Sequence, residues 1–176
     1  AEGVGDSALG EARDRDDVAG FGQFNRLAPK AAGGQHLGDT APPDDLGGAR
    51  AGSGGWAPAA EAVVAEIEAA GGEAMASAAS VTDFAAVQEM VAAAMSRWGR
   101  VDILVNNAGV LRDKTFAKME LEDFRFVVDV HLMGAVNCTK AVWDHMREAN
   151  YGRVVMTTSS SGLYGNFGQC NYGAAK

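Results

Sequence analysis

The stretch that decides the fold is VDILVNNAG, residues 101–109. Its first five residues form a short, nearly continuous apolar run, bounded by Gly99 before it and Asn106-Asn107 after it. Such a run is typical of a strand that is buried on both faces of a parallel sheet. In open α/β folds the ligand site lies just beyond the carboxyl ends of the strands. We therefore predict a strand at 101–105, with functional residues immediately after it.

Helices and further strands alternate on both sides of this run. Apolar side chains recur every three or four residues in the helical segments, Gly71-Gly72 is expected to stop the first helix, and Thr82 is the candidate cap of the second. The expected elements are helices at 57–70, 84–98 and 120–149, and strands at 73–77 and 153–158. This alternation predicts β-α-β units, a parallel sheet and an open α/β fold.

Residues 1–44 have a different composition. They contain no isoleucine, few β-branched residues, and no run of four large apolar side chains. No strand is therefore expected in them, and we interpret 1–44 as an irregular or disordered leader that precedes a partial domain at 45–176. The bias toward Gly, Ala, Arg and Pro is what GC-rich DNA encodes out of frame, so one hypothesis is a misread coding sequence. A genuine but unusual leader is the alternative.

Composition narrows the class of protein. The net charge is −8, from 23 acidic against 15 basic residues with no run of Lys or Arg, so no nucleic-acid partner is expected. No apolar stretch approaches the roughly 20 residues that span a bilayer, so we expect no membrane partner and a cytoplasmic location. Cys138 and Cys170 fit no metal-ligand spacing, so reduced thiols and no metal site are expected.

Three places after the expected strands are dense in small or polar residues: Asn106 to Gly109, Ser159 to Gly162, and the segment from Tyr172 to Lys176. Tyr172 and Lys176 are four residues apart, which places them on one face of a helix. A neighbouring ammonium favours a phenolate, so Tyr172 would exchange a proton with an alcohol or a carbonyl near neutral pH. Ser159 would hold the substrate oxygen, and a bound cofactor would carry the hydride.

Taken together, Asn-Asn-Ala-Gly, a serine thirteen residues ahead of the tyrosine, and Tyr-x-x-x-Lys resemble the short-chain dehydrogenase/reductase family. Asp45 to Gly48, Asn106 to Met119 and Tyr151 to Lys176 resemble its branch with the 3-hydroxyacyl-CoA dehydrogenase domain of multifunctional β-oxidation enzymes. The resemblance covers 45–176. It implies an α/β, Rossmann-like doubly wound parallel sheet, a small acyl-CoA-like substrate, and a homodimer or homotetramer.

The resemblance also assigns roles to single residues. It implies catalytic roles for Ser159, Tyr172 and Lys176, and cofactor contacts from Asp45, Ser80, Asn107, Ala108, Gly109, Tyr172 and Lys176. Asp45 would accept hydrogen bonds from the adenosine ribose, and an acid there repels a 2′-phosphate, so NAD is expected rather than NADP. Ser80 would partly replace an aspartate that relatives carry near the adenine, at the position of Ala79.

Three departures from the family pattern carry expectations of their own. The first strand and its glycine-rich turn are unrecognisable before Asp45, and Lys176 is the last residue, so an incomplete sheet with little or no activity is expected. His131 stands where many relatives carry an asparagine. It is interpreted either as a group that titrates near neutral pH or as a core histidine.

The function expected from the sequence is hydride transfer between NAD(H) and a secondary alcohol or ketone, most plausibly a 3-hydroxyacyl thioester. One alternative is a 3-oxoacyl-carrier-protein reductase of the same family, which is usually NADPH-dependent. The other is a non-catalytic remnant whose long helix, Glu120 to Ala149, pairs with another subunit.

Overall fold

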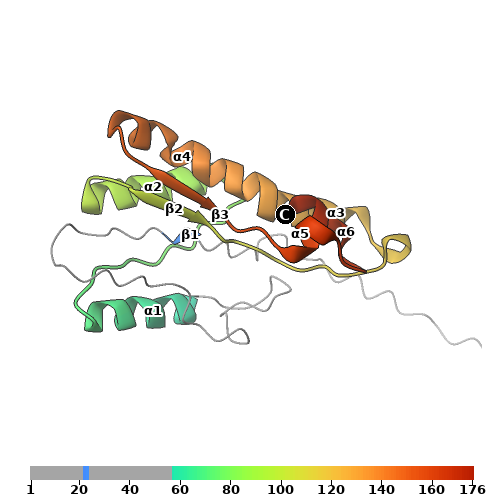
Figure 1. Cartoon of the computed structure of the whole chain (residues 1–176). Helices are drawn as coiled ribbons and strands as arrows, with labels where there is room; N and C mark the ends of the chain where they lie inside the picture. The colour runs from blue at the N-terminus through green and yellow to red at the C-terminus, as the bar shows by residue number, and fades with distance from the viewer. Residues whose placement is uncertain (1–21, 24–56) are drawn as a thin grey trace, which may run out of the picture.

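The structure is a computed structural model that describes residues 22–23 and 57–176 (Figure 1). Its elements, in chain order, are β1 (Gly22–Gln23), α1 (Ala57–Ala69), α2 (Phe84–Trp98), β2 (Ile103–Asn106), the 3-10 turn η1 (Phe116–Lys118), α3 (Leu121–Val128), the π-helical turn η2 (Asp129–Met133), α4 (Gly134–Glu148), β3 (Arg153–Met156), α5 (Ser160–Tyr164) and α6 (Cys170–Ala175). No helix among these residues is long and apolar enough to cross a membrane.

The sheet has the order β1-β2-β3, and β2 and β3 are parallel. Their register pairs Ile103 with Arg153 and Asn106 with Met156. The chain between them runs through α3, η2 and α4, which is the helical crossover that a parallel pair requires. The predicted β-α-β unit is therefore confirmed for the strands around residues 101–105 and 153–158.

A third strand was not predicted. β1 pairs antiparallel with β2, with Gly22 opposite Asn106 and Gln23 opposite Val105, so the expectation of no strand within 1–44 is wrong at these two residues. The ladder uses only backbone groups, and the free edge of β2 offers unpaired N–H and C=O groups to any extended segment. The side-chain composition of residues 1–44 therefore did not indicate β1.

The core lies between β2 and the helices that cover it. In Figure 1, α2 and α4 lie together on one side of the sheet, and α1 lies on the other side. The largest fully buried side chains are Leu104, Val81, Val87, Val127, Val130, Val142 and Asn171. Ile103 and Val105 are only half-buried, and every side chain of β3 is exposed. The prediction of a strand buried on both faces therefore holds for Leu104 but is wrong for its neighbours.

Two local predictions also change. α2 is capped by Asp83, whose Oδ1 accepts hydrogen bonds from the N–H groups of Ala85 (2.9 Å) and Ala86 (3.2 Å). The hydroxyl of Thr82, the predicted cap, pairs instead with the hydroxyl of Ser80 at 2.9 Å. The carboxylate of Asp83, one residue closer to the helix, is better placed to accept from the free N–H groups of the first turn of α2. Residues 73–77 join no strand among the described residues, so that weak prediction is wrong.

The predicted long helix is confirmed as one helical path, Leu121 to Glu148, with a change of pitch in the middle. At η2 the N–H of Gly134 bonds to the carbonyl of Asp129, five residues back. Such π-turns are rare and are frequently found at functional sites. Here the turn carries His131.

Candidate active site

Tyr172 and Lys176 lie on one side of α6, as their spacing predicts. The Nζ atom of Lys176 is 5.8 Å from the centroid of the Tyr172 ring. This ammonium also donates a hydrogen bond to the carbonyl of Thr157, just past the end of β3, at 2.8 Å. Partial burial lowers the pKa of Lys176. The pair therefore sits at the carboxyl end of the parallel strands, where ligands bind in α/β folds.

His131 lies against the same tyrosine. Its ring centroid is 5.0 Å from that of Tyr172, and the two rings are nearly perpendicular. The imidazole is 9% exposed, and its Nε2 is 3.0 Å from the backbone nitrogen and 2.9 Å from the carbonyl oxygen of Val110. Burial lowers the pKa of His131, and repulsion from Lys176 adds to that, while the bond to Val110 opposes it. His131 is thus a core histidine that also touches the tyrosine.

The buried Nδ1 atom of His131 has no hydrogen-bond partner among the described residues. A protonated imidazole carries a donor on each nitrogen, so charging this ring would leave a buried donor unpaired. Burying the neutral ring therefore costs less free energy than burying the charged ring. This agrees with the lowered pKa of His131.

The turn after β2 joins the two parallel strands. The Thr157 hydroxyl donates to Oδ1 of Asn107 at 2.9 Å, and Asn106 Nδ2 donates to the hydroxyl of Thr139 at 3.1 Å. A small cavity of about 10 Å³ opens beside this turn. It is lined by Val81, Val105, Asn106, Asn107, Ala108, Val130, His131, Gly134, Ala135 and Cys138. Asn107 and Ala108 therefore line a hollow of about the size of one water molecule.

Two glycines bring α5 against α6. A Cβ atom on Gly162 would come within 2.7 Å of the Lys176 carbonyl carbon, and one on Gly173 would lie 3.0 Å from the Ser161 carbonyl oxygen. Only glycine permits this approach. Ser159, the third predicted catalytic residue, caps α5 by accepting a hydrogen bond from the Ser161 N–H at 3.2 Å. The segment that starts with Ser159 is thus packed onto the helix of Tyr172 and Lys176.

The cofactor contacts predicted for two further residues stay predictions. Ser80 lies in the turn before α2, where its hydroxyl pairs with that of Thr82. Asp45 lies outside the described residues.

One group of residues beside Tyr172 was not predicted from the sequence motifs. Asn171, beside Tyr172, is fully buried, and it bonds to the loop that follows β2. Asn171 directly precedes the tyrosine, and both it and its loop partners lie in stretches that resemble the family branch, 151–176 and 106–119. The resemblance assigned no role to Asn171, Arg112, Asp113 or Lys114.

The sequence is similar to those of known proteins. The model of the short chain dehydrogenase family matches residues 53–176. Among curated proteins, peroxisomal multifunctional enzyme A of Dictyostelium discoideum is 52% identical over 133 residues, which are 76% of this chain and 30% of that protein. The 3-oxoacyl-[acyl-carrier-protein] reductase of Synechocystis is 47% identical over 118 residues, which are 67% of this chain and 48% of the reductase.

A solved structure gives the fold. The crystal structure of NAD+-bound xylitol dehydrogenase superposes with a TM-score of 0.66 at 32% identity, covering 68% of this chain and 46% of that one. The Rossmann-like fold class predicted from the sequence is therefore confirmed. The chain spans less than half the length of each of these three proteins.

Proposed function

This chain belongs to the short chain dehydrogenase family, and we propose that it supplies the acid and base groups of a nicotinamide-dependent oxidoreductase that acts on a secondary alcohol or ketone. The observation that carries the proposal is the surroundings of Tyr172. Its ring centroid lies 5.0 Å from that of the His131 imidazole and 5.8 Å from the ammonium of Lys176, at the carboxyl end of β2 and β3.

The roles of the side chains follow from their chemistry. The Tyr172 hydroxyl takes the proton from an alcohol, or returns it to a carbonyl oxygen. The positive charge of Lys176 lies beside the ring, 5.8 Å from its centroid. The Ser159 oxygen accepts one hydrogen bond within α5, and its own O–H proton is available for a hydrogen bond to the substrate oxygen.

The polar groups at this edge of the sheet fit a nicotinamide nucleotide. The Lys176 ammonium donates one of its three N–H groups to Thr157 and can donate another to a ribose hydroxyl. The hydroxyl oxygens of Thr157 and Thr158 can accept from ribose hydroxyls, and Asn107 and Ala108 line the cavity beside them. When bound, this group supplies or accepts the hydride. The NAD+-bound neighbour supports a nicotinamide cofactor, and Asp45, predicted to repel a 2′-phosphate, favours NAD over NADP.

A 3-hydroxyacyl thioester is the substrate class we propose. The similarity to a peroxisomal multifunctional enzyme and to a 3-oxoacyl reductase supports an acyl substrate. The test is oxidation of a series of 3-hydroxyacyl-CoA thioesters with NAD+, set against reduction of the 3-oxoacyl compounds with NADPH. Faster turnover in the second assay would favour the carrier-protein reductase.

Tyr172→Phe tests the chemistry of the site. Loss of the hydroxyl should lower kcat about 100- to 10,000-fold, the range for a positioned acid or base. Tyr151→Phe is the matched control, because Tyr151 precedes β3 at the opposite end of the strand and keeps its packing on Arg153 as phenylalanine. Equal kcat in Tyr172→Phe and in the unmodified protein would contradict the proposal.

A second candidate function rests on the surface of the long helix. Leu132, Val136 and Trp143 are 47, 48 and 54% exposed and lie at helical spacing. This supports pairing of the helix with another subunit, as expected for a non-catalytic relative. Analytical ultracentrifugation of the unmodified protein and of Trp143→Ala tests it. Association that Trp143→Ala weakens, together with no binding of nicotinamide nucleotides in calorimetry, would favour this function over the enzyme.

A further inference from the structure

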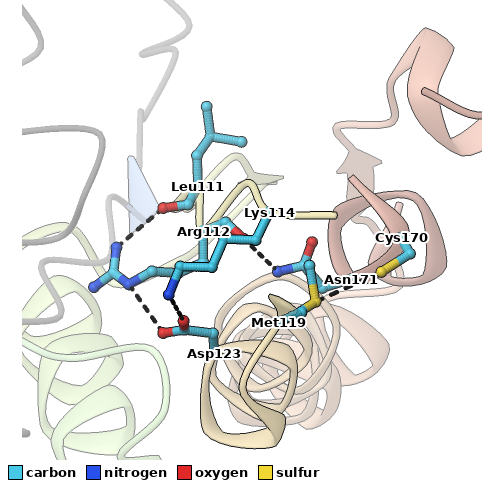
Figure 2. Close-up of polar contacts among 7 residues, drawn as sticks. All are labelled: Leu111, Arg112, Lys114, Met119, Asp123, Cys170 and Asn171. Carbon is cyan, nitrogen blue, oxygen red and sulfur yellow. Dashed lines mark hydrogen bonds and ion pairs between the residues drawn. The ribbon is translucent and has the colours of Figure 1, made fainter. Parts of the chain in front are cut away.

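A buried amide joins Tyr172 to the loop after β2. Asn171 is 0% exposed. Its Nδ2 donates to the carbonyl oxygen of Arg112 at 3.0 Å (Figure 2). Its Oδ1 accepts a hydrogen bond from the N–H of Tyr172 at 2.8 Å. That N–H belongs to the first turn of α6, where backbone donors have no partner inside the helix. One side chain therefore holds the tyrosine's own backbone and ties it to a distant segment.

The tie is part of a longer contact between two segments. Lys114 donates its N–H to the carbonyl of Gly168 at 2.9 Å, and Gln169 Nε2 donates to the carboxylate of Asp113 at 2.8 Å. Together with the bond of Asn171 to Arg112, these contacts align residues 112–114 with residues 168–171 in opposite directions. The start of α6 is thus fixed along three successive residues of the loop.

The loop itself is anchored to α3. Asp123 places Oδ2 3.0 Å from Lys114 Nζ and Oδ1 3.7 Å from Arg112 Nε (Figure 2). The Arg112 guanidinium lies 4.9 Å from the centroid of the Phe126 ring and donates to the Leu111 carbonyl at 3.0 Å. These contacts hold the backbone carbonyl to which Asn171 donates.

A helix of six residues is too short to be stable by itself, so external contacts determine where α6 lies. We propose that Asn171 is a positioning residue for Tyr172: its amide, anchored through Arg112 to α3, sets the place of the tyrosine against His131 and Lys176. The inference rests on the acid–base role proposed above for Tyr172. A displacement of a reacting group by about 1 Å can lower a rate about 100-fold.

The test compares substitutions of two asparagines that each donate a hydrogen bond to a backbone carbonyl. Asn171→Asp keeps the shape of the side chain but removes the donor to Arg112, and Asn171→Ala removes the amide without burying a charge. Asn137→Asp is the control for the loss of an amide donor, because Asn137 Nδ2, on α4, donates to the carbonyl of Val81 at 2.8 Å. Each variant is assayed for kcat and KM with NAD+ and a 3-hydroxyacyl-CoA, with circular dichroism to confirm folding at the assay temperature.

A second readout needs no turnover. The chain has three tyrosines, so ¹³Cζ-labelled tyrosine gives three ring signals, and Tyr172→Phe identifies the one from Tyr172. We expect both Asn171 variants to shift or broaden this signal and to lower kcat about 10- to 100-fold with little change in KM. Asn137→Asp should leave the signal in place.

The outcomes separate the two proposals. If Tyr172→Phe abolishes turnover while Asn171→Ala leaves kcat and the Tyr172 signal unchanged, the positioning role is wrong and the acid–base role stands. If Tyr172→Phe turns over at the unmodified rate, the acid–base role is wrong, and the positioning role is overturned with it. An Asn137→Asp variant that moves the Tyr172 signal as far as Asn171→Ala does would reduce Asn171 to general structural support and also overturn the inference.

Discussion

The imidazole of His131 occupies the space that a side chain at Gly109 would need. A Cβ atom on Gly109 would overlap Cε1 of the ring and lie 3.2 Å from its Nδ1. The glycine of Asn-Asn-Ala-Gly, predicted to allow close approach of a cofactor, thus allows close approach of a buried side chain that contacts Tyr172. The glycine and the histidine form one packing unit, although 22 positions of sequence separate them.

The pairing predicts non-additive mutations. Gly109→Ala should lower the free energy of unfolding by about 1 to 3 kcal/mol, because the ring has to move within a packed core. In the background His131→Asn the shorter side chain leaves room, so the same substitution should cost less. Urea unfolding of the two single variants and the double variant measures this coupling.

A second glycine serves as the control for that coupling. Gly152→Ala would crowd Met146, near the amino end of β3, where a Cβ atom would lie 2.7 Å from the Met146 Cβ. Its cost should be the same in the unmodified protein and in His131→Asn. Additive effects of Gly109→Ala and His131→Asn would show that the ring does not explain the glycine.

The lowered pKa of His131 predicts a loss of stability in mild acid. The unfolded chain takes up a proton on this histidine near pH 6.5, whereas the folded protein resists protonation until the pH falls further. The unfolded state therefore binds more protons in this window, and the free energy of unfolding should fall as the pH goes from about 7.5 to 5.5. One such group contributes at most about 1.4 kcal/mol per pH unit.

His131→Asn removes the titrating group, so the slope over this window should become smaller. Urea unfolding at a series of pH values gives the slope for both proteins. An unchanged slope in His131→Asn would mean that other groups cause the acid sensitivity.

The sequence was informative wherever the signal was local. The spacing of Tyr172 and Lys176, the periodicity of the helices and the apolar run at 101–105 each concern neighbours along the chain, and the structure agrees with them. The errors at Thr82 and at residues 73–77 were local, but others arose where the partner is distant. β1 is defined by its backbone pairing with β2, and the burial of Asn171 depends on a carbonyl at Arg112. No pattern within a short window encodes such pairings.

The N-terminal cap of α2 gives a prediction about two adjacent residues. Asp83→Ala removes the acceptor for two backbone N–H groups and should lower the free energy of unfolding by about 1 kcal/mol. Thr82→Ala removes only an exposed hydrogen bond between the hydroxyls of Thr82 and Ser80, so it should change the free energy of unfolding by less than about 0.5 kcal/mol. Urea unfolding of both variants decides between the two caps, and a larger cost for Thr82→Ala would restore the cap predicted from the sequence.

The two cysteines should differ sharply in reactivity. Burial raises the pKa of the Cys138 thiol to about 11, so at pH 8 about one molecule in a thousand carries the reactive thiolate. Cys170, the first residue of α6, is only partly buried, and its sulfur lies 3.5 Å from the sulfur of Met119. Iodoacetamide should therefore modify one cysteine of the folded protein and both after unfolding, as counted by mass spectrometry. Cys170→Ser should abolish the fast reaction, and Cys138→Ser should leave it.

Because Cys170 adjoins Asn171, a bulky group on its sulfur should also displace the start of α6 and lower turnover in step with labelling. Rapid labelling of Cys138 in the folded protein would mean that α4 does not pack on β2 as described.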